Sequence, residues 1–236
     1  MQIIPVIDLM QGQVVHAKLG QRSTYAPINS VLCSTSAAHD VVTALIKLYR
    51  FHVFNIADID AIENTGNHHD LIETLRDDFP EITFWVDSGI RNVNARMLYQ
   101  KNIRAVIGSE NMPTLQAYKA VSYAYESRHV LSIDVRDELQ LGASELHQTG
   151  RFWPDDIICM SLTTVGSNAG PDLTRLNKLQ QLNAGRKTPT GIYAAGGIRD
   201  LMDLHILKKM GIKGALMATA LHNGSLSAAD LKVISQ

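Results

Sequence analysis

Short apolar runs recur along the whole chain, and each is followed by a stretch that mixes polar and apolar residues. The runs are nearly continuous in hydrophobicity, which is typical of strands that are buried on both faces of a parallel sheet. They predict eight strands at residues 3–7, 52–56, 82–86, 105–107, 130–133, 157–160, 191–195 and 214–217.

The segments between the runs have the apolar spacing of amphipathic helices. They predict helices at residues 36–49, 69–78, 94–100, 114–126, 172–182 and 201–210. Strands that alternate with helices form parallel sheets through right-handed crossovers, and 236 residues suit one closed barrel. The predicted fold class is therefore α/β, a (β/α)₈ TIM barrel that forms a single domain over residues 1–236.

Two features refine this prediction. Gly142, Gly150 and Pro154 interrupt the segment after Asp134, so we expect a short or irregular fifth helix. A weak internal repeat places a strand ending in Ile-Asp, a Gly-Ile-Arg turn and a strand with small residues in the same order in each half. This order predicts a two-fold repeat of half-barrels, roughly residues 1–118 and 119–236.

Composition narrows the classes of partner. Apolar residues make up 45% of the chain and the net charge is −1, so we expect neither nucleic-acid binding nor attachment to anionic membranes. The two cysteines, Cys33 and Cys159, form no CxxC pair, and His68-His69 lacks a carboxylate at ligand spacing, so no metal site is predicted. The first residues lack the charged region and the cleavage site of a signal peptide, so we expect a cytoplasmic protein. We also expect that it requires no cofactor and is a monomer, although its oligomeric state stays open.

The Gly-Ile-Arg turns carry the first candidate chemistry. Glycine at a strand end lets the backbone approach an anion closely, and loops after the last barrel strands frequently hold phosphate. The alternative is that these glycines serve only tight turns, and that Arg91 and Arg199 form ordinary ion pairs. We predict two phosphate cradles, made from Gly89, Gly108, Ser109, Gly196, Gly197, Ala218 and Thr219.

Two aspartates carry the second candidate chemistry. Asp8 ends the first predicted strand and Asp134 the fifth, so they stand on opposite sides of an eight-stranded ring. Partly desolvated carboxyl groups at strand ends can act as acid and base in turn. The alternative is that each one caps its own loop. Asp58 and Asp60 end the second strand and either orient the substrate or cap the next loop.

Together these residues resemble the ProFAR isomerase branch of histidine biosynthesis. The matching segments span nearly the whole chain, at residues 3–9, 58–61, 88–91, 107–109, 132–136, 170–173, 194–200 and 218–221. The resemblance implies a phosphorylated small-molecule substrate and an Amadori rearrangement of an aminoaldose to an aminoketose, which is a metal-independent intramolecular oxidoreduction. It places the catalytic aspartates at Asp8 and Asp134, and the phosphate contacts at Gly89, Ser109, Gly197 and Thr219.

The sequence departs from the family pattern at the active-site end. When the sequences are aligned on Gly170-Pro171, Met160 stands at the position of a functional threonine of the family. Thr163 or Thr164 could take the place of that threonine only with a shift of register. Asp87 stands where the family has glycine and would repel an anion if it pointed inwards. Thr164, Arg91 and Asp58 are candidate substrate-orienting residues.

These departures leave several functions open. The first is the histidine-pathway isomerisation itself. The second is a divergent isomerase or lyase for another phosphorylated substrate, such as an intermediate of methanopterin or methanofuran synthesis. A third is the related cyclase that works with a glutaminase, although its strand-six Asp-Ile signature is absent here. The fourth is an inactive barrel that only binds a phosphorylated ligand.

Overall fold

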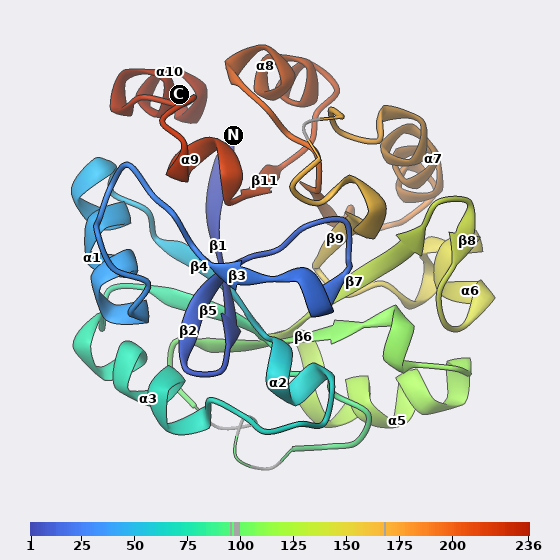
Figure 1. Ribbon diagram of the computed structural model, residues 1–236. Coiled ribbons are helices and arrows are strands. Elements are labelled where there is room, and N and C mark those ends of the chain that lie inside the picture. The colour runs from blue at the N-terminus through green and yellow to red at the C-terminus, as the bar shows by residue number, and fades with distance from the viewer. Residues whose placement is uncertain (95, 97–99, 168) are drawn as a thin grey trace.

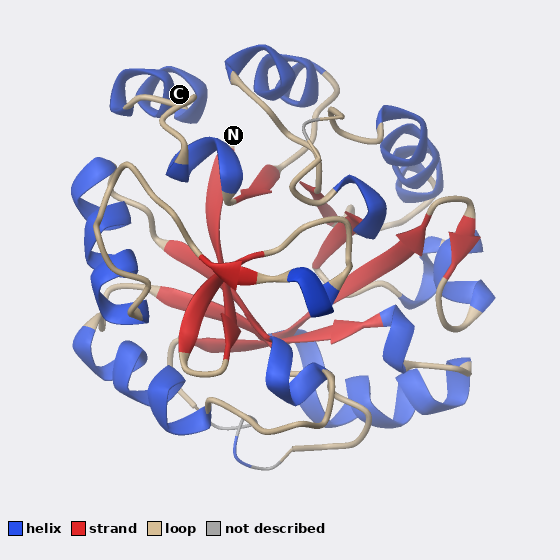
Figure 2. Ribbon diagram, in the orientation of Figure 1, coloured by secondary structure: helices blue, strands red, loops and turns tan. Residues whose placement is uncertain are grey.

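Eight parallel strands close into a barrel surrounded by helices in the computed structural model, which describes residues 1–94, 96, 100–167 and 169–236 (Figures 1 and 2). The last strand pairs with the first, with Ile4 opposite Leu216, and this pairing closes the ring. All eight predicted strands are confirmed: β1 (Gln2–Met10), β4 (Val53–Asp58), β5 (Thr83–Asp87), β6 (Ile103–Gly108), β7 (His129–Arg136), β9 (Asp156–Ser161), β10 (Gly191–Ala195) and β11 (Gly214–Met217).

The helices lie outside the ring and cover the strands (Figure 2). The main ones are α1 (Ala38–Leu48), α3 (His69–Asp78), α5 (Leu115–Tyr125), α7 (Leu173–Ala184), α8 (Leu201–Lys209) and α10 (Ala228–Ser235). The fifth crossover helix, α6 (Ser144–Gln148), is short, as the glycines around it predict. Most of the helix expected at residues 94–100 lies outside the described residues. The sequence analysis did not predict α10, which begins with a capping box between Ser227 and Asp230.

Apolar side chains fill two regions, one inside the ring and one between the ring and the helices. The inner cluster includes Ile4, Trp85, Val130 and Tyr193, and the rings of Trp85 and Tyr193 pack edge to face at 4.9 Å. Because successive side chains of a strand point to opposite faces, the other side chains of these strands meet the helices. Burial on both faces explains why the strands are nearly continuous apolar runs.

The loops at the carboxyl ends of the strands carry extra elements. After β1 the chain forms β2 (Gln13–His16), the 3-10 turn η1 (Arg22–Thr24) and β3 (Ala26–Pro27). Strand β2 pairs antiparallel with β1 on one side and with β3 on the other. Figure 1 shows this first loop lying across the centre of the ring. Short helices α2 (Ile59–Ile62) and α9 (Thr219–His222) follow β4 and β11, and β8 (Leu139–Gln140) pairs with β7.

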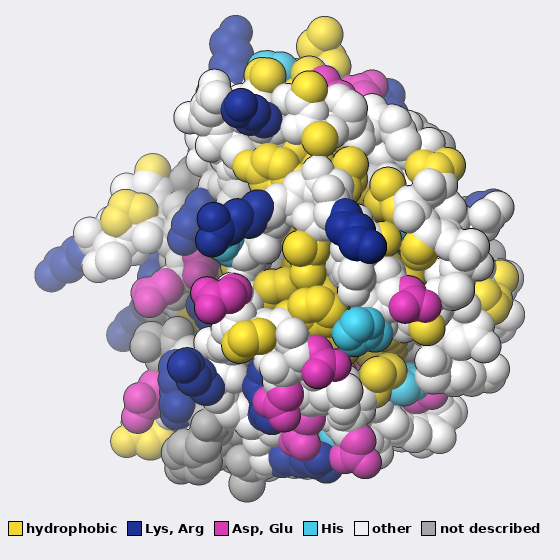
Figure 3. Space-filling view, turned by 90° about the vertical axis from the view of Figure 1, so that its left-hand side faces the viewer, with side chains coloured by type: hydrophobic (Ala, Val, Ile, Leu, Met, Phe, Trp, Pro, Cys, Tyr) yellow, Lys and Arg dark blue, Asp and Glu magenta, His cyan; other side chains and the backbone are white. Residues whose placement is uncertain are grey.

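The opposite end of the barrel carries ion pairs. Asp156 forms ion pairs of 2.7 Å with Arg104 and Lys213 near the amino-terminal ends of the strands, where polar contacts serve stability. Basic and acidic side chains lie interspersed on the face shown in Figure 3, as the net charge of −1 leads one to expect. Among the described residues, no helix has both the length and the apolar character needed to cross a bilayer.

Candidate active site

A pocket opens at the carboxyl ends of the strands, where barrel enzymes hold their substrates. Its floor is the inner apolar cluster, and its walls are inward-facing side chains from every strand of the ring. The first loop and the loop after β9 cover part of it. The wall residues include Val6, Asp8, Asn55, Ala57, Asp87, Val106, Ser132, Asp134, Met160, Ala195 and Leu216.

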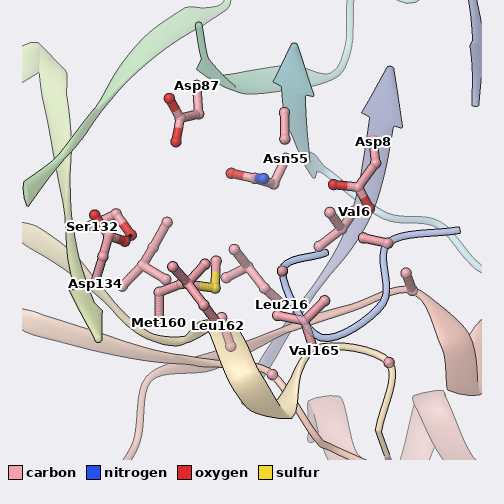
Figure 4. Close-up of a pocket in the computed structure, with 18 of the residues that line it drawn as sticks. Val6, Asp8, Asn55, Asp87, Ser132, Asp134, Met160, Leu162, Val165 and Leu216 are labelled. Carbon is pink, nitrogen blue, oxygen red and sulfur yellow. Dashed lines mark hydrogen bonds between the residues drawn. The ribbon is translucent and has the colours of Figure 1, made fainter. Parts of the chain in front are cut away.

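Asp8 and Asp134 face this pocket from opposite walls. Their strands, β1 and β7, are four positions apart around the ring of eight in either direction. Figure 4 shows the two carboxyl groups on opposite sides of the pocket. The structure therefore brings the two predicted aspartates together over one opening, while their catalytic role stays a prediction.

The Asp8 carboxyl group is buried without hydrogen-bonded support. Its residue is 9% exposed, and burial raises its pKa to about 7, with the Arg22 guanidinium acting in the opposite direction. No hydrogen bond to this carboxyl group is present in the part of the chain that the structure describes. A carboxyl group in this state exchanges protons near neutral pH.

The Asp134 carboxyl group is equally buried but firmly held. The Ser132 hydroxyl donates to its Oδ1 at 2.5 Å, and the Ser109 hydroxyl and the Glu110 backbone N–H donate to its Oδ2 at 3.2 and 3.1 Å. Burial still raises its pKa to about 7, assisted by the charges of Glu110 and Asp87, while the hydrogen bonds lower it. Burial therefore raises the pKa of both aspartates to the same range, although only the Asp134 carboxyl group is held by hydrogen bonds.

The second-half turn is open towards the pocket. Gly196 and Gly197 both have positive φ, +97° and +76°, and both line the pocket with Thr219 and Ala218. A side chain on Gly197 would overlap the carbonyl oxygen of Gly170, so only glycine fits there. The turn, the neighbouring small residues and the Thr219 hydroxyl make this wall fit for an anion.

The first-half turn is closed by the protein itself. Asp87 Oδ1 accepts the Gly89 backbone N–H at 2.9 Å, so a carboxylate occupies the donor predicted for phosphate. An ideal Cβ on Gly89 would lie 2.7 Å from the Ile62 Cα, which shows how tightly this turn packs on α2. The Arg91 guanidinium donates to the carbonyl oxygens of Gly89 and Ile62 at 3.1 Å each. Arg91 does not line the pocket.

The other predicted contacts of this half are also used internally. Ser109 is fully buried, and its hydroxyl both donates to the Asp134 carboxylate and accepts the Asp134 backbone N–H. An ideal Cβ on Gly108 would meet Asp134 Oδ2 at 3.2 Å and Asp87 Oδ2 at 3.8 Å, so carboxylates surround this position. Gly89, Gly108 and Ser109 are absent from the pocket lining, and the expectation of a first-half cradle finds no geometric support.

The three candidate substrate-orienting residues make contacts within the scaffold, and their role towards a substrate stays a prediction. Asp58 is fully buried, and its carboxylate accepts the backbone N–H groups of Ala61 and His68 and contacts His68 Nδ1 at 2.8 Å. The Thr164 hydroxyl donates to the Ser161 carbonyl oxygen at 3.0 Å. Like Arg91, neither lines the pocket. Asp58 thus caps the next loop, which agrees with one of the two interpretations left open by the sequence.

Met160 faces the pocket from β9, as the alignment on the Gly-Pro turn predicts, with Leu162 and Val165 beside it (Figure 4). Thr163 and Thr164 do not line the pocket, so neither replaces the family's threonine there. This wall is apolar where the family pattern is polar.

Sequence reasoning missed several pocket residues. Arg22 reaches over the pocket from the first loop and pairs with Glu110 at 3.1 Å and with Glu63 at 3.8 Å. Tyr25 lies beside it, and burial, with the charge of Asp8, raises its pKa to about 12. Asn55 lines the floor from β4. The only signal for Asn55 was a polar residue within an apolar run, while the loop residues had no pattern at all.

The described residues contain no group of three or more histidine, cysteine or acidic side chains arranged to hold a metal ion. Both cysteines are free thiols, Cys159 buried and Cys33 half-buried.

The comparisons with known proteins agree with this architecture. An uncharacterized protein of Methanocaldococcus jannaschii is 29% identical over 98% of this chain and 97% of its own length. The proteins named 1-(5-phosphoribosyl)-5-((5-phosphoribosylamino)methylideneamino)imidazole-4-carboxamide isomerase from Listeria innocua and Clostridium botulinum are 26% and 24% identical, over the whole of this chain and 99% and 98% of their own. The model of the family described as "Histidine biosynthesis protein" matches residues 2–227. The chain therefore belongs to the histidine biosynthesis protein family.

Proposed function

We propose that this protein is an aldose–ketose isomerase that rearranges a phosphorylated aminosugar, with Asp8 and Asp134 as its acid–base pair. The observation that carries the proposal is the placement of two buried carboxyl groups on opposite walls of one pocket, each with its pKa raised to about 7. At neutral pH such a pair holds one proton in a large share of the molecules. An acid and a base are then available at the same time.

The chemistry follows from that pair. The protonated carboxyl group donates to the ring oxygen of the aminoaldose, and the C1–O bond breaks to give a protonated imine at C1. The ionised carboxyl group then takes the proton from C2, and the electron pair forms the C1=C2 bond of an enaminol. Loss of the C2 hydroxyl proton and protonation at C1 give the aminoketose. The first carboxylate takes up the hydroxyl proton and the second returns its proton to C1, so both aspartates end the cycle in their starting protonation states.

The substrate is anchored by a phosphate group on the second-half wall. The backbone of Gly196 and Gly197 and the hydroxyl of Thr219 line the pocket there. The His16 ring nitrogen lies 3.2 Å from Thr219 Oγ1 and adds a further polar group at this rim. Anchoring by one end leaves the carbon atoms that react between the two aspartates.

A second candidate concerns the substrate. The relatives from Listeria and Clostridium are named for a molecule with two phosphoribosyl groups. In this chain Asp87 takes the Gly89 N–H, and Met160 replaces a polar side chain. These two differences favour a divergent isomerase or lyase whose substrate carries a single phosphate.

Three variants and one substrate test the proposed chemistry. Purified protein is given the histidine-pathway aminoaldose, and turnover is followed by absorbance. If it reacts, Asp8→Asn and Asp134→Asn should each lower turnover by roughly 10²-fold or more, whereas Glu63→Gln, which changes a charge outside the pocket, should not. Near-normal rates in either aspartate variant contradict the mechanism.

The divergent candidate has its own outcome. It predicts no turnover of the histidine-pathway compound and no rescue of a histidine auxotroph, but binding of inorganic phosphate that Gly197→Val removes. Rescue of the auxotroph contradicts it. Phosphate binding without turnover of any aminosugar phosphate, unchanged in both aspartate variants, identifies an inactive barrel.

A further inference from the structure

The wall of the pocket opposite the phosphate turn is built from hydrogen-bond acceptors. Asp8 and Asp87 lie in one layer of the ring, on either side of Ala57, because Ala57 is paired with Asp8 on β1 and with Asp87 on β5. Asp87 uses Oδ1 to accept the Gly89 N–H, and its Oδ2 faces the same position as Asp134 Oδ2. Asp8 and Asp87 thus both line the pocket beside Ala57, and the Asn111 amide nitrogen lies near the same position as Asp87 Oδ2 and Asp134 Oδ2.

A buried amide oxygen points to the same conclusion independently. Asn55 is 5% exposed and lines the pocket one layer below Ala57, since side chains two residues apart on a strand share a face. Its Oδ1 is buried and has no hydrogen-bond partner within the described part of the chain. Buried acceptors are nearly always paired in folded proteins, so this oxygen awaits a donor. Figure 4 shows the Asn55 side chain projecting into the pocket.

Among the described residues, the cations on the pocket lining are Arg22 and Arg136. The Arg22 guanidinium acts on the pKa of Asp87 and of Asp8 through its charge, but its ion pairs are made elsewhere. Arg22 is shared between Glu110 and Glu63 in the roof. Arg136 is the last residue of β7 and is exposed at the rim. A second anionic group of a ligand would therefore meet carboxylates here, while the Arg22 guanidinium is engaged with Glu110 and Glu63.

We infer that this wall binds a protonated amine of the ligand, held by Asp87 Oδ2 and Asn55 Oδ1. An ammonium group has three donors and no acceptor, which suits a wall of acceptors with one or more negative charges. The inference rests on the proposed function, because it makes the ligand an aminoalkyl-type phosphate whose two ends bear opposite charges. It also gives a physical reason for the loss of a second phosphate site.

Matched probes separate the two ends of the ligand. Affinities are measured by calorimetry at pH 8 in the presence of EDTA for 6-aminohexyl phosphate, hexyl phosphate and hexane-1,6-bisphosphate, with shorter and longer chains to scan the span. The aminoalkyl phosphate should bind about tenfold or more tightly than the alkyl phosphate of equal length, and the bisphosphate should bind no better than the alkyl phosphate.

The variants assign that preference to the wall. Asp87→Asn and Asn55→Leu should each reduce the advantage of the amine to about threefold or less, while leaving hexyl phosphate affinity unchanged. Glu63→Gln, the control for a lost charge near the mouth, should keep the full advantage. An equal affinity for the amino and alkyl probes, or a preference for the bisphosphate, overturns the inference.

Failure of the phosphate site looks different. If hexyl phosphate does not bind at all, the phosphate part of the proposed function is wrong. The amine-binding wall is then tested by comparing the affinities of hexylamine and hexanol in NMR titrations. Binding of hexylamine that Asp87→Asn removes still supports the wall. Equal behaviour of hexylamine and hexanol overturns it, and so does an amine preference that appears only when a divalent metal is added.

Discussion

Replacing Asp8 by asparagine should make the protein more stable and less active. The carboxyl group is buried at 9% exposure and accepts no hydrogen bond among the residues that the structure describes, so its ionised form is poorly solvated. Asparagine has nearly the same shape and carries no charge. The substitution therefore removes the free-energy cost of burying an ionised carboxylate, which the folded protein bears in order to keep a proton-transfer group.

The size of the effect follows from the pKa. Burial raises the pKa of Asp8 from 3.8 to about 7, and a rise of about 3 pH units corresponds to roughly 4 kcal/mol. Between about pH 4 and about pH 7, the folded state holds a proton on Asp8 that the unfolded state has released. The free energy of unfolding therefore falls as the pH increases through this range. Above pH 7 the cost is complete. Relaxation around the charge recovers part of it, and we expect Asp8→Asn to be roughly 2 to 4 kcal/mol more stable at pH 8.

Urea unfolding of both proteins at pH 5 and pH 8 measures this difference. The advantage of Asp8→Asn should grow by roughly 2 kcal/mol between the two pH values. Asp58→Asn is the control, because Asp58 is a buried aspartate with hydrogen bonds to Ala61 and His68, and its loss should destabilise the protein at pH 8 by about 1 to 3 kcal/mol. An Asp8→Asn protein that is no more stable than the parent at pH 8, or whose advantage does not change with pH, refutes the reasoning.

Three further predictions concern the pocket. The pH profile of kcat/KM should be bell-shaped with its maximum near pH 7, since one aspartate must be protonated and the other ionised, and a flat profile between pH 5 and pH 9 contradicts this. Gly197→Val should weaken inorganic phosphate binding about tenfold or more in calorimetry, whereas Gly211→Val, at a similar φ of +78° but away from the pocket, should leave it unchanged. Asp87→Ala should free the Gly89 N–H and increase affinity for an alkyl bisphosphate, and an unchanged affinity would show that the carboxylate is not what closes this turn.

The fold was accessible from the sequence because strand burial leaves a strong local signal. Runs such as residues 3–7 and 130–133 are apolar on both faces, and the spacing between runs fixes the crossovers. The positions of Asp8 and Asp134 follow directly, since the strand order of a closed ring places the first and fifth strands opposite each other. The placement of these two aspartates at opposite strand ends was therefore predictable.

The roof and the closed turn were not predictable, because they depend on side-chain direction and on contacts between loops. Arg22 reaches Glu110 across 88 residues of sequence, and no local pattern encodes such a pair. Ser109 looks like a phosphate donor in the sequence, but its hydroxyl turns to the Asp134 carboxylate. Asp58 resembles a substrate contact until its burial against His68 is known. A sequence gives the residue type at a strand end and leaves its hydrogen-bond partner open.

The weak internal repeat allows the two ends of the pocket to be compared position by position. Trp85 and Tyr193 occupy matching positions of the repeat and pack against each other inside the ring. Two residues further on, the matching positions hold Asp87 and Ala195. The alanine leaves its glycine turn open to the pocket, whereas the aspartate fills its own turn and presents a carboxylate oxygen in place of a donor. The difference between Asp87 and Ala195 thus gives the two ends of the pocket unlike electrostatic character, and we expect this asymmetry, more than the shared barrel, to determine which ligands can lie across the two aspartates.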